Sequence, residues 1–339
     1  MKAVSITRHG GPDVLRPEEK PDLQPGPGQV RIQVRAAGIN FADIMQRMGL
    51  YPSRLRPPYV PGFEVAGTVD AVGKGVQNWR PGTRAMAMLE HGGYAGQALA
   101  PAERVVPIPA AMSFEEAAAL PVNYLTAYHM MVRLGNLRKG ERILIHTAAG
   151  GVGLAAVQLA RGIGAEIFGT ASASKHALLR EKGVDHPMDY RTQDFAAEVK
   201  RIIGDAGLDM ILDPLGGAAT AKNYELLAPL GRLMIFGFSR AATGEKRGLG
   251  TLLEAARMPR FHPRKLMMEN RAVFGVHLGR MTTPAAQAVL AEELQALFRL
   301  YAEGQIRPVI GKTFPLDQAA EAHRFIQRRE NVGKVVLVP

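Results

Sequence analysis

The residues with the clearest chemical meaning lie in the glycine-rich segment 147–153, Thr-Ala-Ala-Gly-Gly-Val-Gly. Ala148, Gly150 and Gly153 have the spacing of the dinucleotide-binding fingerprint, with alanine in its first position. Small residues permit a tight turn here and let backbone N–H groups approach a pyrophosphate at the positive end of the following helix. Because an apolar strand pattern precedes the segment and a helical pattern follows it, we predict a nucleotide site. The alternative is a tight turn with a structural role only.

The segment 169–175, Gly-Thr-Ala-Ser-Ala-Ser-Lys, bears on which nucleotide is bound. NAD-selective sites place a carboxylate at the end of the second strand, and this segment has none. Thr170 and Ser172 supply hydroxyls and Lys175 a cation, groups that suit a 2′-phosphate. Tyr190 and Arg191, after the third predicted strand, add to the same pocket. The pattern favours NADPH over NADH, and the alternative for Lys175 is an exposed residue in the first turn of a helix.

The chain has 339 residues and no cysteine, which excludes disulfides, thiol catalysis and cysteine-based zinc sites. The histidines, including His91 and His146, have no metal-ligand spacing, so we expect no metal. The net charge of +11 is spread along the chain. Aromatic residues make up only 6% of the sequence, and they do not alternate with basic residues as in a nucleic-acid-binding surface. We therefore expect no nucleic-acid partner.

No run of eighteen apolar residues occurs, so no transmembrane helix is expected. The apolar run at residues 3–6 is too short for a signal peptide, and we expect a cytoplasmic protein.

The chain has two parts with different sequence patterns. Residues up to about 120 are β-rich, with alternation of apolar and polar residues at 29–35 and further strands at 63–69 and 83–88. A Ser-x-x-Glu capping box at 113–116 then opens a helix. Beyond it, buried strands alternate with helices, the pattern of a parallel sheet covered on both faces. The expected strands are 142–147, 166–170, 209–213 and 232–236, and the expected helices between them are 153–162, 175–182 and 219–227.

After a less regular stretch at 239–270, we expect strands at 271–278, 306–314 and 334–338 and helices at 284–303 and 316–329. The fold class predicted is a doubly wound parallel α/β (Rossmann) sheet inserted in a mainly β domain. The α/β domain is placed at residues 123–265, and the β domain at 1–122 and 266–339.

Several motifs resemble the zinc-independent quinone oxidoreductase (ζ-crystallin) branch of the medium-chain dehydrogenase/reductase family. They are Asn-Phe-Ala-Asp at 40–43, Pro-Gly-Phe-Glu-Val-Ala-Gly at 61–67, Asn-Trp-Arg-Pro-Gly at 78–82, the loop at 148–153 and Asp-Pro-Leu-Gly-Gly at 213–217. Within that branch, the runs at 120–128, 168–176 and 331–335 most resemble the synaptic-vesicle amine-transport-protein-like group. The resemblance covers essentially the whole chain and implies a GroES-like β domain.

The resemblance also implies how the protein works. Zinc-dependent relatives carry cysteine where Asn40 stands and histidine where Phe63 stands, so the Lewis acid that zinc provides is not expected. We therefore expect an NADPH-dependent reductase of quinones or α,β-unsaturated carbonyls. Asn40, Tyr51 and Thr126 are expected at the nicotinamide, with Asn40 or Tyr51 donating to the substrate oxygen. The other expected cofactor contacts are Gly150, Gly151 and Val152 at the pyrophosphate, Lys175 and Tyr190 at the 2′-phosphate, Phe236, Gly237, Phe274 and His277 beside the ribose, and Asn331 and Lys334 closing the site. A homodimer through residues 271–278 is also implied.

Three of these residues have a plainer interpretation. In that interpretation Asn40 would only cap a turn, Tyr51 would pack against Pro57 and Pro58, and His277 would be a core histidine on a buried strand. Arg47, Met48 and Tyr59 suggest an open rim of mixed polarity around the substrate.

The alternative function is an NADPH-binding, membrane- or lipid-associated protein with weak or no catalysis, an idea that comes from the group it resembles. The basic segment 240–265 would contact anionic lipid, although a solvated surface loop is favoured over peripheral membrane contact. The residues concerned are Lys246, Arg247, Arg257, Arg260, Arg264 and Lys265, with Leu249, Leu252, Leu253 and Met258 as the apolar face.

Overall fold

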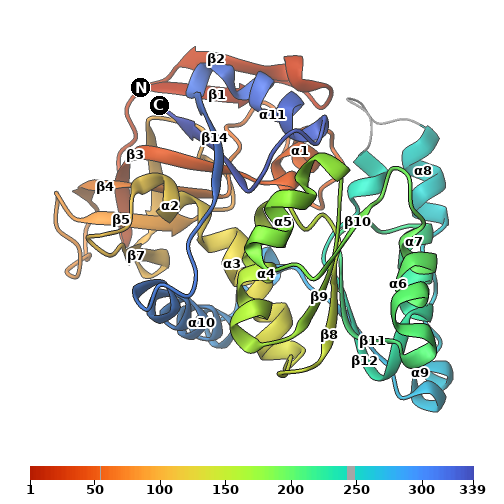
Figure 1. The fold of residues 1–339 in the computed structure, drawn as a ribbon. Helices are drawn as coiled ribbons and strands as arrows, with labels where there is room; N and C mark the ends of the chain where they lie inside the picture. The colour runs from red at the N-terminus through yellow and green to blue at the C-terminus, as the bar shows by residue number, and fades with distance from the viewer. Residues whose placement is uncertain (54, 243–248) are drawn as a thin grey trace. The chain divides into compact units, whose positions relative to one another are not determined.

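The computed structural model describes residues 1–53, 55–242 and 249–339 (Figure 1). The chain forms two compact units. The first contains Met1–Val122 and Pro308–Pro339, and the second contains the described residues of 123–307.

The second unit is built on a six-stranded sheet with strand order β10-β9-β8-β11-β12-β13. Each neighbouring pair is parallel. This is the order 3-2-1-4-5-6 of the Rossmann fold, so the predicted doubly wound sheet is confirmed. The strands are β8 (Arg142–Ile145), β9 (Glu166–Ala171), β10 (His186–Asp189), β11 (Leu208–Asp213), β12 (Leu227–Ile235) and β13 (Ala272–Gly275).

Helices cover both faces of this sheet, with α4 and α5 on one side and α6 and α7 on the other (Figure 1). Ile143, Leu144 and Ile145 are consequently at most 1% exposed, which explains why β8 is a continuous apolar run. The helices of this unit are α3 (Pro121–Tyr128), which begins at the boundary, α4 (Gly151–Ile163), α5 (His176–Lys182), α6 (Phe195–Ile203), α7 (Ala218–Glu225), α8 (Leu249–Ala256), α9 (Pro263–Glu269) and α10 (Pro284–Ala302). A π-helical segment, His129–Leu134, continues α3.

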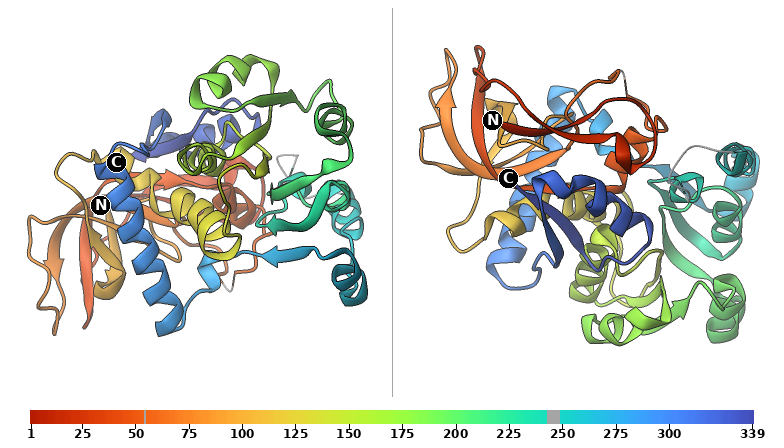
Figure 2. Two further views of the ribbon diagram at one scale, coloured as in Figure 1. Left: turned by 60° about the horizontal axis from the view of Figure 1, so that its bottom comes forward. Right: turned by 90° about the horizontal axis from the view of Figure 1, so that it is seen from above.

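The first unit is mainly β. Its seven-stranded sheet contains β14-β15-β3-β4-β5-β7, with β6 also paired to β3, and a separate pair joins β1 and β2. The strands are β1 (Lys2–Ile6), β2 (Leu15–Glu19), β3 (Gln29–Ile39), β4 (Glu64–Val72), β5 (Arg84–Met88), β6 (Gln97–Pro101), β7 (Val105–Pro107), β14 (Ile310–Pro315) and β15 (Lys334–Val338). The helices are α1 (Phe41–Arg47), α2 (Phe114–Ala119) and α11 (Ala319–Gln327). Both ends of the chain lie in this unit, close to each other (Figure 2).

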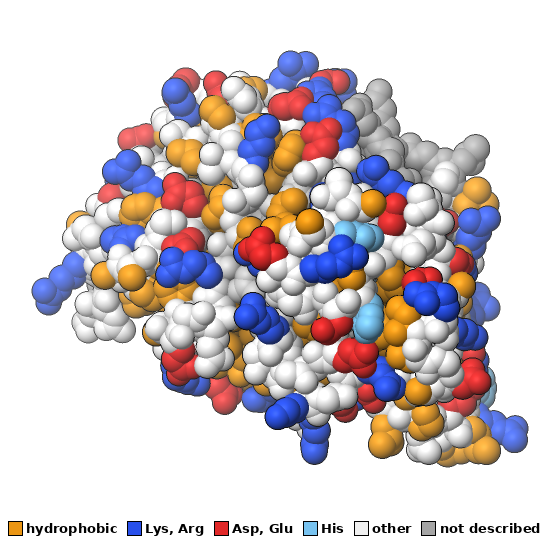
Figure 3. Space-filling model, in the orientation of Figure 1, with side chains coloured by type: hydrophobic (Ala, Val, Ile, Leu, Met, Phe, Trp, Pro, Cys, Tyr) orange, Lys and Arg blue, Asp and Glu red, His pale blue; other side chains and the backbone are white. Residues whose placement is uncertain are grey.

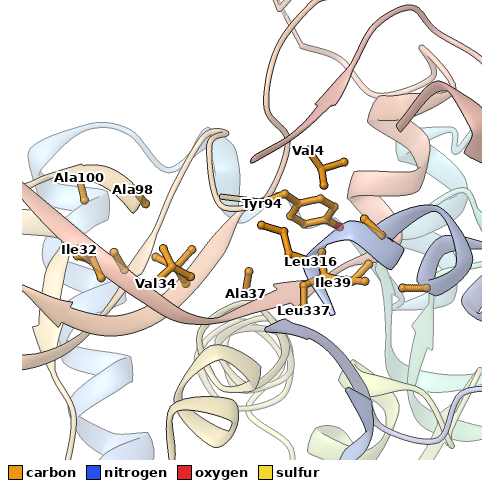
Figure 4. Close-up of a cluster of buried hydrophobic side chains, with 14 of the residues drawn as sticks. Val4, Ile32, Val34, Ala37, Ile39, Tyr94, Ala98, Ala100, Leu316 and Leu337 are labelled. Carbon is orange, nitrogen blue, oxygen red and sulfur yellow. The ribbon is translucent and has the colours of Figure 1, made fainter. Parts of the chain in front are cut away.

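Alternation along β3 builds the core of this unit. Val30, Ile32 and Val34 are buried while Gln29, Arg31 and Gln33 are partly exposed, as the sequence predicts. Their apolar side chains lie with Tyr94, Leu316 and Leu337 in one cluster (Figure 4). The predicted capping box is also confirmed, because Ser113 Oγ accepts from Glu116 N–H and the Glu116 carboxylate accepts from Ser113 N–H.

The second boundary between the units falls after Arg307, whereas the sequence interpretation places it after residue 265. The difference has a physical reason, because β13 pairs with β12 and so extends the parallel sheet. The Tyr124 hydroxyl donates to the Arg307 carbonyl oxygen at 2.9 Å, which holds residues up to 307 in the same unit.

Within the part of the chain that the structure describes, none of the helices has both the length and the apolar character needed to cross a bilayer.

Candidate functional site

The glycine-rich segment joins β8 to α4. Thr147 has a positive φ of 51°, which turns the chain away from the strand, and Gly150 is the N-cap of α4. A Cβ added to Gly153 would lie 2.3 Å from the Thr147 carbonyl oxygen, so only glycine permits this closeness of helix and loop. The backbone N–H groups at the start of α4 have no partners within the helix and suit a pyrophosphate. The residues present therefore fit a dinucleotide at this loop.

Asn123 also lies at this loop and was not predicted from the sequence. A Cβ added to Gly151 would lie 2.3 Å from Asn123 Nδ2, so the amide sits directly over the first turn of α4. The Asn123 side chain is buried. In the sequence, Asn123 belongs to the run 120–128 that carries the family resemblance, but no periodic pattern marks it there as a site residue.

A buried histidine holds the start of the loop. Thr170 Oγ1 accepts from Thr147 N–H at 3.2 Å and lies 3.1 Å from His146 Nδ1, while His146 Nε2 lies 2.8 Å from Asn223 Oδ1. Because an amide oxygen only accepts, Nε2 carries the proton and Nδ1 accepts from the Thr170 hydroxyl. Burial lowers the pKa of His146, which keeps the ring neutral. His146 is thus structural, and it holds the Thr170 hydroxyl, whose contact with the cofactor stays a prediction.

The loop lies at the point where the strand order reverses, because β8 is flanked by β9 and β11. Ligands of open α/β sheets bind at this point, beyond the carboxyl ends of the strands. Beyond β11, Asp213 accepts from Leu215 N–H at 2.8 Å and from the Thr220 hydroxyl at 2.6 Å. The Asp213 side chain is fully buried, so it shapes the 213–217 turn.

The proposed 2′-phosphate residues lie at the same edge of the sheet. β9 and β10 pair with Ala171 opposite Asp189, which brings Ser172 and Tyr190 together just beyond the two strands. The Asp189 carboxylate accepts from Arg191 N–H and the Thr192 hydroxyl, so it is committed to its own turn. Ser172 Oγ lies 3.3 Å from Ser174 Oγ, and Lys175 closes the short turn before α5.

The residues expected beside the ribose follow the last two strands. Phe236 and Gly237 come directly after β12, and Phe236 N–H donates to the Asp213 carbonyl oxygen at 3.0 Å. Phe274 lies in β13, opposite Met234. His277 lies beyond the end of β13 and is exposed, so the expectation of a core histidine on a buried strand is wrong. Thr126 is buried on α3.

The first unit contains a separate polar cluster of Asn40, Glu64 and Lys334. Lys334 Nζ donates to Asn40 Oδ1 at 2.6 Å and also to Glu64 Oε1, and Asn40 Nδ2 donates to Glu64 Oε1 at 2.8 Å. Glu64 Oε2 accepts from the N–H of Val122 at 2.8 Å, in the first turn of α3. The relative exposures of Glu64, Lys334 and Asn40 are 0%, 3% and 7%.

Strand register explains why residues so far apart in the sequence meet. β15 runs antiparallel to β3 with Val335 opposite Ile39, and β4 runs antiparallel to β3 with Val65 opposite Ala37. Lys334 and Glu64 each stand one residue before these pairs on their own strands, and Asn40 stands one residue after Ile39. The cluster therefore forms where β3 ends and its neighbours β4 and β15 begin.

A second set of buried polar groups lies behind Asn40. Asn40 N–H donates to Asp43 Oδ2 at 2.7 Å, and burial raises the pKa of Asp43 to about 7 despite the nearby Lys334 cation. Tyr94 lies close to Asp43, and its hydroxyl is 3.0 Å from His323 Nε2. Burial, followed by the Arg47 charge, lowers the pKa of His323 well below its usual range, so this histidine is neutral.

Arg47 completes this set and corrects a sequence expectation. Its side chain is fully buried, donating to the Gly10 carbonyl oxygen and to Gln327 Oε1 at 2.9 Å. Met48 is also buried. The expectation that Arg47 and Met48 form an open rim is therefore wrong.

Two further predicted site residues of this unit, Tyr51 and Asn331, contact residues that are close in sequence to Glu64 and Lys334. The Tyr51 ring packs on Phe63 with centroids 5.4 Å apart, next to Glu64 in the sequence. Asn331 Nδ2 donates to the Gly333 carbonyl oxygen at 3.2 Å, in the turn before β15. Glu64 and Asp43 were not predicted as site residues, although both stand in the motifs that carried the resemblance.

Family models match both parts of the chain. The alcohol dehydrogenase GroES-like domain matches residues 26–110, and the zinc-binding dehydrogenase model matches residues 182–337. Despite that name, the chain has no cysteine, and its described residues contain no group of three or more histidine, aspartate or glutamate side chains suited to a metal.

Individual relatives extend the likeness over the whole chain. The rat synaptic vesicle membrane protein VAT-1 homolog is 43% identical over 100% of this chain and 84% of its own length. The Escherichia coli quinone oxidoreductase, solved with NADPH, has a TM-score of 0.88 and 29% identity over 100% of both chains. The CurK enoyl reductase has a TM-score of 0.84 and 32% identity over 99% of this chain and 98% of its own.

The chain belongs to the medium-chain dehydrogenase/reductase family of oxidoreductases, and it is close to the VAT-1 homologs. The family resemblance predicted from the sequence is thereby confirmed.

Proposed function

We propose that this chain is an NADPH-dependent reductase that needs no zinc and reduces quinones or α,β-unsaturated carbonyls. The observation that carries the proposal is the loop 147–153, packed at the reversal point of a parallel sheet through Gly153. At the neighbouring strand end, Ser172, Lys175 and Tyr190 stand where an NAD-selective site would carry a carboxylate. Two solved relatives, a quinone oxidoreductase and a mycobacterial protein, were complexed with NADPH.

When bound, NADPH supplies the hydride, which adds to the β-carbon of an enone. The electron pair of the C=C bond then shifts, negative charge grows on the carbonyl oxygen, and the α-carbon takes a proton from solvent. The chain must orient the acceptor and stabilise that oxygen. We assign this donor role to the Asn40 amide, with Tyr51 as the second candidate.

The direct test follows NADPH consumption in the presence of a chelator, with ortho-quinones, para-quinones and enones as acceptors and NADH in parallel. Turnover with NADPH that the chelator does not change supports the proposal. Inhibition by the chelator, or the absence of turnover with every acceptor, contradicts it.

Lys175→Ala is expected to weaken NADPH binding about 10- to 100-fold and to leave NADH binding unchanged. A hydrogen bond to a charged group contributes about 1.5–3 kcal/mol, and only NADPH carries the 2′-phosphate. Quenching of protein fluorescence by each nucleotide measures both affinities. Lys182→Ala, at the far end of α5, is the matched control. An equal loss for both nucleotides would show that Lys175 does not contact the 2′-phosphate.

We also propose a homodimer in which β13 of one copy meets β13 of another. β13 is the last strand in the order of the sheet and pairs with β12 on one side, and among the described residues no strand pairs with its other edge, where a second copy could add. Sedimentation equilibrium checks this proposal, and a monomer at micromolar concentration contradicts it.

Lipid association is the second candidate function, and an exposed apolar patch favours it. Met267 and Met268 on α9 are 69% and 70% exposed, and Leu230, whose N–H donates to the Asn270 carbonyl oxygen at the end of α9, is 76% exposed. Arg264 and Lys265 stand on the same helix, and Figure 3 shows hydrophobic atoms beside basic ones at the lower right, where Figure 1 places α9. Relatives are named as synaptic vesicle membrane proteins.

Part of the basic segment does not support that surface. Met258 Sδ accepts from Gly217 N–H, so this side chain faces inward rather than joining an apolar face. Lys246, Arg247 and the side chains of Leu249 and Leu252 lie outside the described residues. Co-sedimentation with anionic and neutral vesicles at two salt concentrations tests the candidate, because electrostatic binding needs the anionic lipid and weakens with salt.

A further inference from the structure

Lys334 is a deeply buried cation of the first unit. It lies between Asn40 Oδ1 and Glu64 Oε1, and its side chain is 3% exposed. A buried ion pair of this kind adds little net stability compared with apolar residues of the same size. Its placement against a candidate catalytic amide therefore suggests a role in function.

The ammonium fixes which way the Asn40 amide faces. Because an ammonium only donates, the atom toward Lys334 must be the amide oxygen, and Nδ2 must lie on the other side. One Nδ2 hydrogen goes to Glu64 Oε1. The other Nδ2 hydrogen makes no hydrogen bond to the described residues. This hydrogen is therefore the one that could donate to the oxygen of the acceptor substrate.

The cluster also has a charge balance that depends on Lys334. Glu64 is fully buried, and without a counter-charge its carboxylate would repel negative charge that grows on an oxygen beside Asn40. With Lys334 present, the Glu64–Lys334 pair is neutral overall. Withdrawal of electron density from the amide oxygen by the ammonium also makes the Nδ2 hydrogens better donors.

We propose that Lys334 is a positioning residue that acts through Asn40, orienting and polarising the amide and cancelling the charge of Glu64. The inference rests on the proposed function, because it assigns the Asn40 N–H to that reaction. It differs from the expected role of Lys334 as a cofactor contact, because Nζ faces Asn40 and Glu64.

The test needs a variant that folds. Lys334→Met alone leaves the Glu64 carboxylate buried and unpaired, which is strongly destabilising. The double variant Lys334→Met/Glu64→Gln keeps the cluster neutral. The amide oxygen of the introduced glutamine then accepts from Val122 N–H, its NH2 group faces Asn40, and the Asn40 amide is expected to turn its oxygen toward it. Lys334→Arg is the conservative variant, and Arg31→Met, which breaks the Arg31–Asp70 pair in the same sheet, is the control.

In turnover, the double variant is expected to lose about 100-fold in kcat, the effect of removing one preorganised donor, with KM changed less than about threefold. The isotope effect with 4-deuterated NADPH should rise, because hydride transfer becomes slower than the other steps. Lys334→Arg should keep most of the activity, and Arg31→Met all of it. A kcat that is unchanged, or that falls only with the folded fraction while the isotope effect stays constant, overturns the inference.

A readout without turnover separates this inference from the proposed function. 4-Nitrophenol is titrated against each protein in the presence of NADP⁺, and its absorbance reports the ionised form. The wild type is expected to bind the phenolate and lower the apparent pKa of the bound phenol relative to the double variant. Absence of phenolate binding by the wild type, or equal values in both proteins, counts against Lys334 as a positioning residue. If the wild type binds phenolate with the lower apparent pKa but reduces no quinone or enone, the proposed function fails, and only the orienting effect of Lys334 on the Asn40 amide stands.

Discussion

Asp43→Asn is expected to raise the free energy of unfolding by about 2–3 kcal/mol more at pH 8 than at pH 5. The reason is the Asp43 carboxyl group, whose pKa burial raises from 3.8 to about 7. Between these two values the folded protein holds a proton that the unfolded chain has released. The stability of the wild type therefore falls as the pH rises, by about 1.4 kcal/mol per unit, until the folded carboxyl ionises near pH 7. Asparagine does not titrate and keeps an oxygen for Asn40 N–H.

The measurement is urea unfolding of both proteins at half-unit intervals from pH 5 to pH 8.5. The two stability curves should diverge up to about pH 7 and run parallel above it. Asp205→Asn, at an exposed carboxyl group, serves as the control. Curves that stay parallel over the whole range would show that Asp43 is ionised in the folded protein throughout.

Gly153→Ala is expected to weaken NADPH binding more than about 100-fold and to destabilise the second unit. The new Cβ would lie 2.3 Å from the Thr147 carbonyl oxygen and 2.7 Å from Ala148 Cα, and backbone atoms cannot move aside as a flexible side chain can. Either α4 shifts or the loop opens, and both changes displace the N–H groups that would bind the pyrophosphate.

Gly162→Ala is the matched control in the same helix. Its Cβ would meet only Gln305 Oε1, at 3.8 Å, and alanine is favoured over glycine in a helix by about 0.5–1 kcal/mol. Thermal unfolding and nucleotide titration of the two variants should therefore separate clearly. Similar behaviour of both variants would mean that the closeness of α4 to the loop does not matter for binding.

Local patterns predicted much of the fold. The period of two along β3, the apolar run of β8 and the glycine spacing each depend on neighbouring residues, and the structure has all three. Boundaries were less exact, since β8 ends at Ile145 where a strand to 147 was expected. Thr147 ends the strand early because it adopts positive φ.

The polar cluster of the first unit was predicted only in part. The resemblance pointed to Asn40 and Lys334, but their contact depends on the register of β15 against β3 across 294 residues of sequence. Nothing in local periodicity reports such a pairing. Arg47 was misread for the same reason, because Gln327 and His323, which satisfy it, lie on α11. The partner of the Thr170 hydroxyl was equally hidden, because a hydroxyl at a strand end gives no sign of a buried histidine beside it.

The position of β15 in its sheet also constrains how the protein folds during synthesis. β15 lies between β14 and β3, so the strand of this sheet that is synthesised last takes an interior position rather than an edge. At about 5–20 residues per second, the 294 residues between Asn40 and Lys334 take on the order of 15–60 s to synthesise. During that interval Glu64 has no counter-charge, and residues 37–39 of β3, which pair with β15 in the folded protein, lack that partner and are open to other chains. The Rossmann unit is translated whole within the same interval. We therefore expect newly made protein to depend most on chaperones in residues 1–122, until the segment containing Lys334 has been synthesised.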